Sequence, residues 1–210
     1  MSESNIIIRE KTTETARFEE SDADLIRRVR EGERSAFNQL VVKYRNRVMG
    51  LAVRMLGDRG EAEDVAQDVF VKAYRGLSGF QEEALFSTWL YRIAANSCLN
   101  HRKRIRLQPA VSADVSALEL RFPDMASNPH VLLEEKQLKL LIEEAIQALP
   151  EEQRIVVILR DIEGLSYEAI ADALEQELGT VRSRLHRGRM ALQERLKRLM
   201  TPEPRGSVNV

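Results

Sequence analysis

The fold is decided by the stretch Leu165-Ser-Tyr-Glu-Ala-Ile-Ala-Asp-Ala-Leu-Glu-Gln-Glu-Leu-Gly-Thr-Val-Arg-Ser-Arg-Leu-His-Arg-Gly-Arg-Met190. Ser166 is a good helix N-cap, because its hydroxyl can accept a hydrogen bond from a backbone N–H that has no partner inside the helix. The apolar residues that follow it share one helical face: Tyr167, Ile170, Ala171 and Leu174. A second helix is expected to begin near Gly179 or Thr180. The stretch therefore predicts two short helices joined by a tight turn.

The second of these helices has two faces of different chemistry. Its buried stripe is expected to contain Val181, Leu185, Gly188 and Leu192. The opposite face carries residues that can form hydrogen bonds or bear positive charge, together with one methionine: Arg182, Ser183, His186, Arg187 and Met190. A recognition helix in a DNA major groove needs a face of this kind. A solvated face on an ordinary helical hairpin is the alternative, and the pattern alone leaves it open.

The charges of the chain are separated along the sequence. Acidic residues far outnumber Arg154 and Arg160 over residues 151–177, whereas Glu194 is the one acid over residues 179–198. The formal net charge of -1 hides this separation. A local basic stripe matters more for nucleic-acid binding than the total charge does. The charge pattern therefore favours the DNA-binding interpretation of the second helix.

Length and composition indicate a protein of one or two helical domains. The chain has 210 residues, 43% of them hydrophobic and 5% aromatic. Cys98 is the only cysteine, so an internal disulfide is excluded and a reducing cytoplasm is the expected compartment. We expect neither a signal peptide nor a membrane-inserted helix, because no sufficiently long apolar run is present.

The first half of the chain predicts a flexible arm over residues 1–23 and a series of helices after it. Asp58 is expected to cap a helix with the inner stripe Ala62, Val65, Ala66, Val69, Ala73 and Leu77. Asp64, Gln67 and Asp68 lie outside that stripe, and carboxylates four residues apart on a helix repel each other. Either this is a solvated face or it is an acidic docking face for a basic partner.

Aromatic and basic residues meet on the next helix, which is expected to run from Phe86 to about Arg106. Phe86 and Trp89 are expected to be mostly core, whereas Tyr91, Asn96 and Arg102 are expected on or near the outer surface. Aromatic rings beside cations suit single-stranded nucleic acid, because bases stack and phosphates need countercharge.

The expected fold class is all-α, with two small helical domains joined by a flexible linker over residues 108–133. The second domain, residues 134–199, contains the helix-turn-helix, and residues 200–210 form a tail. The histidines are scattered and Cys98 has no partner nearby, so we expect no metal site. No phosphate-binding glycine loop or nucleophile elbow is present, so we expect no cofactor and no enzymatic activity.

Four stretches together resemble the extracytoplasmic function group of bacterial RNA polymerase sigma factors. They are Gly57-Asp-Arg-Gly-Glu-Ala-Glu-Asp-Val-Ala-Gln-Asp-Val-Phe70, Phe86-Ser-Thr-Trp-Leu-Tyr-Arg-Ile-Ala-Ala-Asn96, Leu149-Pro-Glu-Glu-Gln-Arg154 and Gly179-Thr-Val-Arg-Ser-Arg-Leu185. Each stretch is modest alone, but the four in this order are highly specific. The resemblance covers roughly residues 24–199 and implies a sigma region 2 domain over 24–107 and a region 4 domain over 134–199.

The resemblance also implies a role for three groups of residues. Core polymerase would bind Asp64, Gln67 and Asp68. The melted -10 strand would be bound by Phe80, Phe86, Trp89, Tyr91, Asn96 and Arg102. The -35 duplex would be read by Thr180, Arg182, Ser183, His186 and Arg187.

The implied partners are bacterial core RNA polymerase, promoter DNA with its -35 and -10 elements, and an anti-sigma factor that holds the protein inactive. The implied setting is a stress response, and the free protein is expected to be a monomer. The alternative is a helix-turn-helix regulator that acts without core polymerase, as a stable dimer on a palindromic site.

Relatives often carry a glycine in the turn between the last two helices, where this chain has Glu175-Gln-Glu177, so the geometry of this turn is expected to differ. Relatives also differ from this chain at residues 81–83, and the base preference at the -10 element is expected to differ accordingly. We also expect, from the charge separation, that the basic helix over 182–198 folds back on the acidic face over 58–68 in the free protein. Such a contact would mask both sites.

Overall fold

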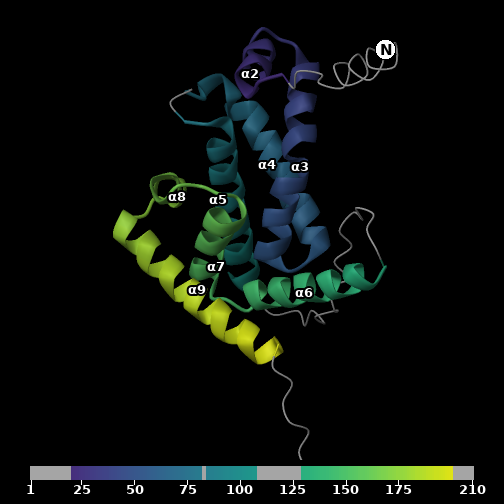
Figure 1. Ribbon diagram of the computed structural model, residues 1–210. Coiled ribbons are helices and arrows are strands. Elements are labelled where there is room, and N and C mark those ends of the chain that lie inside the picture. The colour runs from purple at the N-terminus through teal and green to yellow at the C-terminus, as the bar shows by residue number, and fades with distance from the viewer. Residues whose placement is uncertain (1–19, 82–83, 108–128, 201–210) are drawn as a thin grey trace, which may run out of the picture.

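The computed structural model describes residues 20–81, 84–107 and 129–200. All regular secondary structure in these ranges is helical, which confirms the all-α class (Figure 1). Residues 1–19 of the predicted arm (1–23), 108–128 of the predicted linker (108–133) and 201–210 of the predicted tail (200–210) lie outside the described residues. The first helix begins at Asp22, so the end of the predicted arm is helical. Within the described ranges, none of the helices has the length and hydropathy needed to cross a membrane.

The N-terminal unit consists of α2 (Asp22–Arg30), α3 (Arg34–Leu56), α4 (Arg59–Gly76), a 3-10 turn (Leu77–Gly79) and α5 (Phe86–Leu107). Local signals set their ends. The Asp58 carboxylate accepts a hydrogen bond of 2.8 Å from the backbone N–H of Glu61 and so caps α4, as predicted. Gly57, with φ of 82°, ends α3 in the left-handed conformation that glycine adopts without strain.

The core of this unit lies where α3 packs between α2, α4 and α5. All six residues of the predicted inner stripe on α4 and the turn after it are buried: Ala62, Val65, Ala66, Val69, Ala73 and Leu77. Asp64, Gln67 and Asp68 are exposed on the other side of α4. The helical periodicity of the sequence therefore placed this face correctly.

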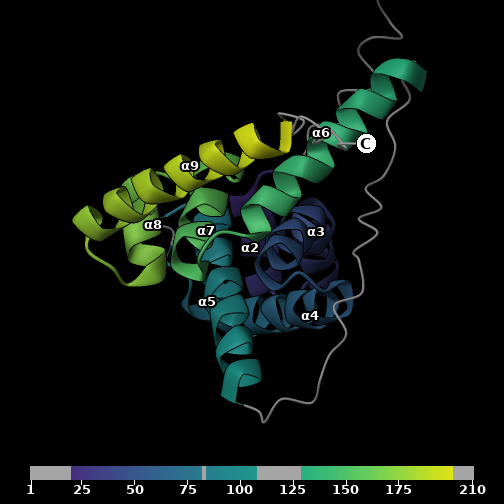
Figure 2. The same cartoon turned by 90° about the horizontal axis from the view of Figure 1, so that it is seen from below.

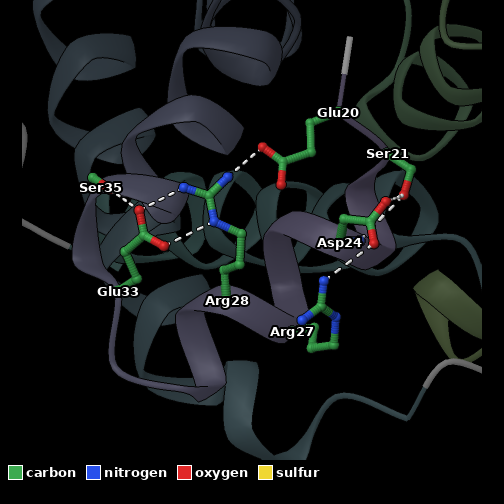
Figure 3. A network of polar contacts seen from close by, with 7 residues as sticks. All are labelled: Glu20, Ser21, Asp24, Arg27, Arg28, Glu33 and Ser35. Carbon is green, nitrogen blue, oxygen red and sulfur yellow. Dashed lines mark hydrogen bonds and ion pairs between the residues drawn. The ribbon is translucent and has the colours of Figure 1, made fainter. Parts of the chain in front are cut away.

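A polar network holds α2 in place (Figure 3). The Arg28 guanidinium lies between the carboxylates of Glu20 and Glu33, and its Nε donates to Glu33 over 2.8 Å. Two residues on, Arg30 donates to the backbone carbonyl of Phe80. The network thus joins α2 to the residues on either side of it, and the Arg30 bond fixes α2 against Phe80.

The C-terminal unit consists of α6 (Pro129–Gln147), α7 (Glu151–Val157), a π-helical turn that continues it (Ile158–Ile162), α8 (Tyr167–Leu174) and α9 (Leu178–Met200). Helix α6 begins at Pro129 and so reaches into the segment that the sequence assigned to the linker. Ser166 caps α8 by accepting a hydrogen bond of 3.0 Å from Ala169, as predicted. Gly188 lets α9 lie close to α7, since a Cβ there would come within 2.8 Å of the Val157 side chain.

The turn between α8 and α9 keeps a glycine-like geometry without a glycine. Glu175 has φ of 52° and ψ of 49°, which is the left-handed conformation. The next residue, Gln176, donates its backbone N–H to the Ala171 carbonyl over 2.9 Å, as in a common helix-ending motif. The departure from the glycine of relatives therefore leaves the turn intact but places a strained residue in it.

Replacing Glu175 by glycine is expected to raise the free energy of unfolding by about 1 kcal/mol, because glycine adopts this conformation without strain. Urea denaturation followed by circular dichroism measures the change. Glu177→Gly is the matched control: it removes the same charge two residues away, where φ is not positive. A free energy of unfolding for Glu175→Gly that equals or falls below that of the wild type would contradict this account of the turn.

The two units pack against each other (Figures 1 and 2). Helix α8 lies against α5, and α6 and α7 contact α3. One continuous cluster of buried apolar residues runs through both units. The expected fold-back of the basic helix on the acidic face is wrong: α9 and α4 lie apart in both views. The α9 arginines Arg184, Arg189 and Arg195 pair inside their own unit, with Glu152, Asp161 and Glu144.

Candidate nucleic-acid and protein interfaces

The outer face of α9 carries the predicted base-reading residues. Arg182, Ser183, His186 and Arg187 are exposed, and Thr180 is half-buried at the start of the helix. The Ser183 hydroxyl donates to the Thr180 carbonyl over 3.0 Å, and Arg187 Nε donates to the Ser183 carbonyl over 3.3 Å. The inner face is buried through Val181, Leu185 and Gly188, as predicted. A helix packed on one side therefore presents donors and positive charge on the other.

Tyr167 supports this face in a way that the sequence did not reveal. Its ring lies 4.9 Å from the Arg160 guanidinium and 5.9 Å from that of Arg182. Arg160 also donates to the Leu165 carbonyl over 2.7 Å, which fixes the first cation against the backbone. Cations over an aromatic face are attracted to it. The stack therefore restrains Arg182, which the periodicity had placed only as a free surface residue.

The acidic face of α4 adjoins an apolar groove. Asp64, Gln67 and Asp68 point outward, and Val71 follows on the same helix with 46% of its surface exposed. The groove beside Val71 is lined by Phe37, Phe70, Val71, Tyr74 and Arg75. Carboxylates next to exposed apolar surface suit a partner that brings both positive charge and apolar side chains.

Three aromatic rings form one cluster at the start of α5. The ring centroids of Phe80 and Trp89 lie 5.0 Å apart, and those of Phe86 and Trp89 lie 5.7 Å apart. Phe80 and Phe86 are buried, whereas Trp89 is half-buried. The two phenylalanines, predicted to contact DNA, therefore act here as the support of Trp89. Glu82 and Glu83 of this loop lie outside the described residues.

A cleft of about 820 Å³ separates this aromatic cluster from the C-terminal unit. The wall from the N-terminal unit is lined by Gly79, Phe80, Gln81, Ala84, Thr88, Trp89 and Arg92. The facing wall comes from α8 and the turn after it, and its charged residues are the acids Asp172, Glu175 and Glu177. An aromatic wall with a cation therefore faces an acidic one.

The remaining residues predicted for the -10 strand are covered by the C-terminal unit. Tyr91 is 1% exposed, and burial first and the Glu163 carboxylate second raise its pKa. The Asn96 amide donates to the Ala173 carbonyl over 3.5 Å. Arg102 donates to Glu151 over 3.0 Å. The expectation that these three lie on or near the outer surface is wrong for Tyr91, which is buried. Asn96 and Arg102 are half-buried and bonded to α8 and α7, respectively.

Charged residues across the interface between the units were missed by sequence reasoning. Arg54 donates to Glu143 through Nε and Nη2, over 3.0 and 2.7 Å, and Glu143 is 4% exposed. Glu151 accepts from both Arg102 and Arg106, the latter over 2.8 Å. Charged residues are rarely buried without partners. The sequence contained one sign of this interface, which is that Glu143 lies next to the apolar stripe of its helix.

Arg154 is the most constrained of these residues. It is 7% exposed, and its guanidinium donates to the carbonyls of Met55 and Leu149 over 2.9 Å each, and to that of Gln147. Met55 lies in the last turn of α3, where backbone carbonyls have no partner inside the helix. Burial, and then the nearby charge of Arg102, lower the pKa of Arg154 to about 10. The group therefore stays charged at neutral pH.

Comparison with known proteins places the chain in a family. The Sigma-70 region 2 model matches residues 40–107, and the Sigma-70 region 4 model matches residues 139–192. RNA polymerase sigma-H factor of Pseudomonas aeruginosa is 41% identical over 87% of this chain and 97% of its own length. ECF RNA polymerase sigma-E factor of Escherichia coli is 38% identical over 86% and 96%.

A solved structure shares the arrangement of helices. The sigma factor RpoE in complex with the anti-sigma factor NepR, from Bartonella quintana, is 26% identical with a TM-score of 0.57. The match covers 77% of this chain and 96% of that one.

Proposed function

The chain belongs to the extracytoplasmic function sigma factors of RNA polymerase, and we propose that it divides promoter recognition among the three surfaces described above. The observation that supports this division is their separation: each surface lies on a different helix and has its own chemistry. Core polymerase binds the acidic face of α4 through Asp64, Gln67 and Asp68. Sigma factors of this family direct that enzyme to specific promoters, and we assign no catalytic chemistry to the chain.

The -35 element is read as duplex by α9. Its outer face consists of Thr180, Arg182, Ser183, His186 and Arg187. Arginine can donate two hydrogen bonds to the major-groove edge of guanine, and Ser183 can bind either a base or a phosphate. Arg182, restrained by Tyr167, is the residue that we expect to discriminate between bases.

The -10 element is bound as a single strand at the cleft. Trp89 offers a ring on which a base can stack, and Tyr91, Asn96 and Arg102 lie along the same helix. Phe80 and Phe86 hold Trp89 from behind. Proteins can read a base of an opened strand by flipping it out of the base stack into a pocket, and we assign this role to the cleft.

An anti-sigma factor is a further proposed partner, because a structural relative was solved with one. Its effect would be to keep the chain from polymerase until a signal releases it. The cytoplasm is the proposed place of action, since the partners of a sigma factor are RNA polymerase and the chromosome. We propose that the free protein is a monomer.

Transcription from a library of random promoters tests the proposed function. Core RNA polymerase is used with and without the protein, and start sites are mapped by sequencing. We expect starts that occur only with the protein and share two sequence elements at a fixed spacing. If no new starts appear and the protein alone shifts a palindromic duplex, a regulator independent of polymerase replaces this proposal.

A further inference from the structure

Helix α2 carries none of the residues assigned above to polymerase or DNA, yet both of its ends are bonded to residues that support Trp89. We propose that α2 positions Trp89 for capture of the -10 strand, with Arg30 and Asp22 as the positioning residues. The inference rests on the proposed function, because it takes the -10 strand as the ligand of Trp89. It adds that base preference at this element depends on two side chains that do not contact DNA.

Trp89 depends on its surroundings for a fixed orientation. Its indole is half-buried and lines the cleft. On the other side it lies against the end of α4, where a Cβ on Gly76 would come within 3.2 Å of the indole Cζ2 atom. A ring that is already ordered before a base stacks on it binds more tightly and more selectively, because binding then costs less entropy. The contacts that restrict the indole therefore bear on base selection.

The first connection runs from the C-terminal end of α2. Arg30 is the last residue of this helix, and its Nη2 donates to the backbone carbonyl of Phe80. The Phe80 N–H donates to the Leu77 carbonyl over 3.2 Å, so both backbone groups of Phe80 are bonded. A hydrogen bond from a charged donor is stronger than a neutral one. The Phe80 ring is buried, with its centroid 5.0 Å from that of Trp89, so a fixed Phe80 limits how the indole can turn.

The second connection runs from the N-terminal end of α2. Asp22 is its first residue, and the carboxylate accepts a hydrogen bond from the Tyr44 hydroxyl and one of 2.7 Å from Lys43 Nζ. The Tyr44 ring is buried and lies 5.5 Å from the Phe86 ring, centroid to centroid. Phe86 in turn lies 5.7 Å from Trp89. Aromatic pairs prefer particular geometries, so the orientation of Tyr44 is passed on to the indole.

The middle of α2 is held firmly enough for its ends to act as fixed points. Leu25 and Ile26 are buried in the core. Arg28 lies between the carboxylates of Glu20 and Glu33, which flank the helix (Figure 3). The helix therefore contacts the aromatic cluster at two places, through Phe80 and through Phe86. If these bonds served the stability of the fold alone, their loss would affect both promoter elements alike.

The first measurement is the fluorescence of Trp89, which is the only tryptophan of the chain. Arg30→Met removes the donor and keeps a side chain of similar shape. We expect it to raise the acrylamide quenching constant of the full chain roughly twofold, because the indole gains local motion. Arg30→Lys keeps a charged donor and is expected to restore most of the wild-type value. Arg27→Met is the matched control, since Arg27 is exposed on the same helix and pairs with Asp24 and Glu31.

The second measurement is base preference in the random promoter library, transcribed by core polymerase with each variant. With Arg30→Met, we expect preference at one downstream position to fall roughly tenfold, since base stacking on an aromatic ring is weakened when the ring is not held. The upstream element and the spacing are expected to stay unchanged. Arg30→Lys is expected to restore the preference in parallel with the quenching constant, and Arg27→Met to resemble the wild type.

Asp22→Ala tests the second connection. Its control is Asp24→Ala, which removes another carboxylate of the first turn, one bonded to Ser21 and Arg27 of the same segment. Asp22→Ala is expected to raise the quenching constant, and the combination with Arg30→Met to raise it further than either change alone. Circular dichroism on every variant checks that the helix content is unchanged.

Four results would overturn the proposal: an unchanged quenching constant in Arg30→Met or Asp22→Ala, equal changes in the matched controls, increased quenching with an unaltered downstream element, or equal relaxation of both promoter elements. Failure of the proposed function looks different, because the wild type itself then yields no new start sites. If the wild type yields them and Arg30→Met leaves the downstream element unchanged, the positioning role of α2 alone is refuted.

Discussion

Replacing Arg154 by methionine is expected to lower the free energy of unfolding by about 3 kcal/mol, because it removes a buried guanidinium that donates to three backbone carbonyls. The arginine donates to Met55, Gln147 and Leu149. Methionine has a similar length, so the cost comes from the lost hydrogen bonds more than from an empty volume. The two units also lose the bond that joins α7 to the end of α3.

Urea denaturation followed by circular dichroism gives the change in stability. Arg187→Met is the control, since Arg187 is exposed on α9 and donates to Ser183 of the same helix. We expect this control to change the free energy of unfolding by less than about 0.5 kcal/mol. A loss below about 1 kcal/mol for Arg154→Met would show that the buried guanidinium contributes little to the stability of the folded chain.

Replacing Asp64 and Asp68 together by alanine is expected to weaken binding to core RNA polymerase roughly 100-fold, the loss expected when central interface contacts are removed. The fold should not suffer. Both carboxylates are exposed and stand four residues apart on α4, where they repel each other, so their removal is neutral or slightly stabilising. Affinity is measured by competition with a labelled sigma factor for a limiting amount of core enzyme.

Glu63→Ala provides the control for this pair of substitutions. Glu63 is an exposed carboxylate on the same helix, but it pairs with Arg59 and lies outside the proposed contact. Its removal is expected to leave the affinity unchanged. Equal losses in the control and the double variant would mean that the general charge of α4, and no specific contact, attracts polymerase.

Local patterns were sufficient to predict the helices and the faces of α4 and α9. The caps at Ser166 and Asp58 have hydroxyl and carboxylate groups that act on the next turn of the chain, so the sequence around them carries the whole signal. The outer face of α9 follows from the helical period in the same way. These features depend on neighbours within a few residues.

Contacts between the two units could not be predicted in this way. The period of α5 identifies the side that packs in its own unit, but it gives no sign that Tyr91 is buried or that Asn96 is bonded to α8. Arg54 and Glu143 are charged, so each is expected at a surface until its partner, distant in sequence, is known. The left-handed conformation of Glu175 could not be predicted either, because residues other than glycine, asparagine and aspartate rarely adopt it.

The central claim, that α9 reads an upstream duplex element while α5 captures a downstream strand, is tested most directly by promoter selection with Arg182→Ala. The same random promoter library is transcribed by core polymerase with the wild type and with the variant. We predict that preference is lost at one upstream position, by about 1–3 kcal/mol, while the downstream element and the spacing are unchanged. A uniform loss at all upstream positions, or a changed downstream element, would contradict the account.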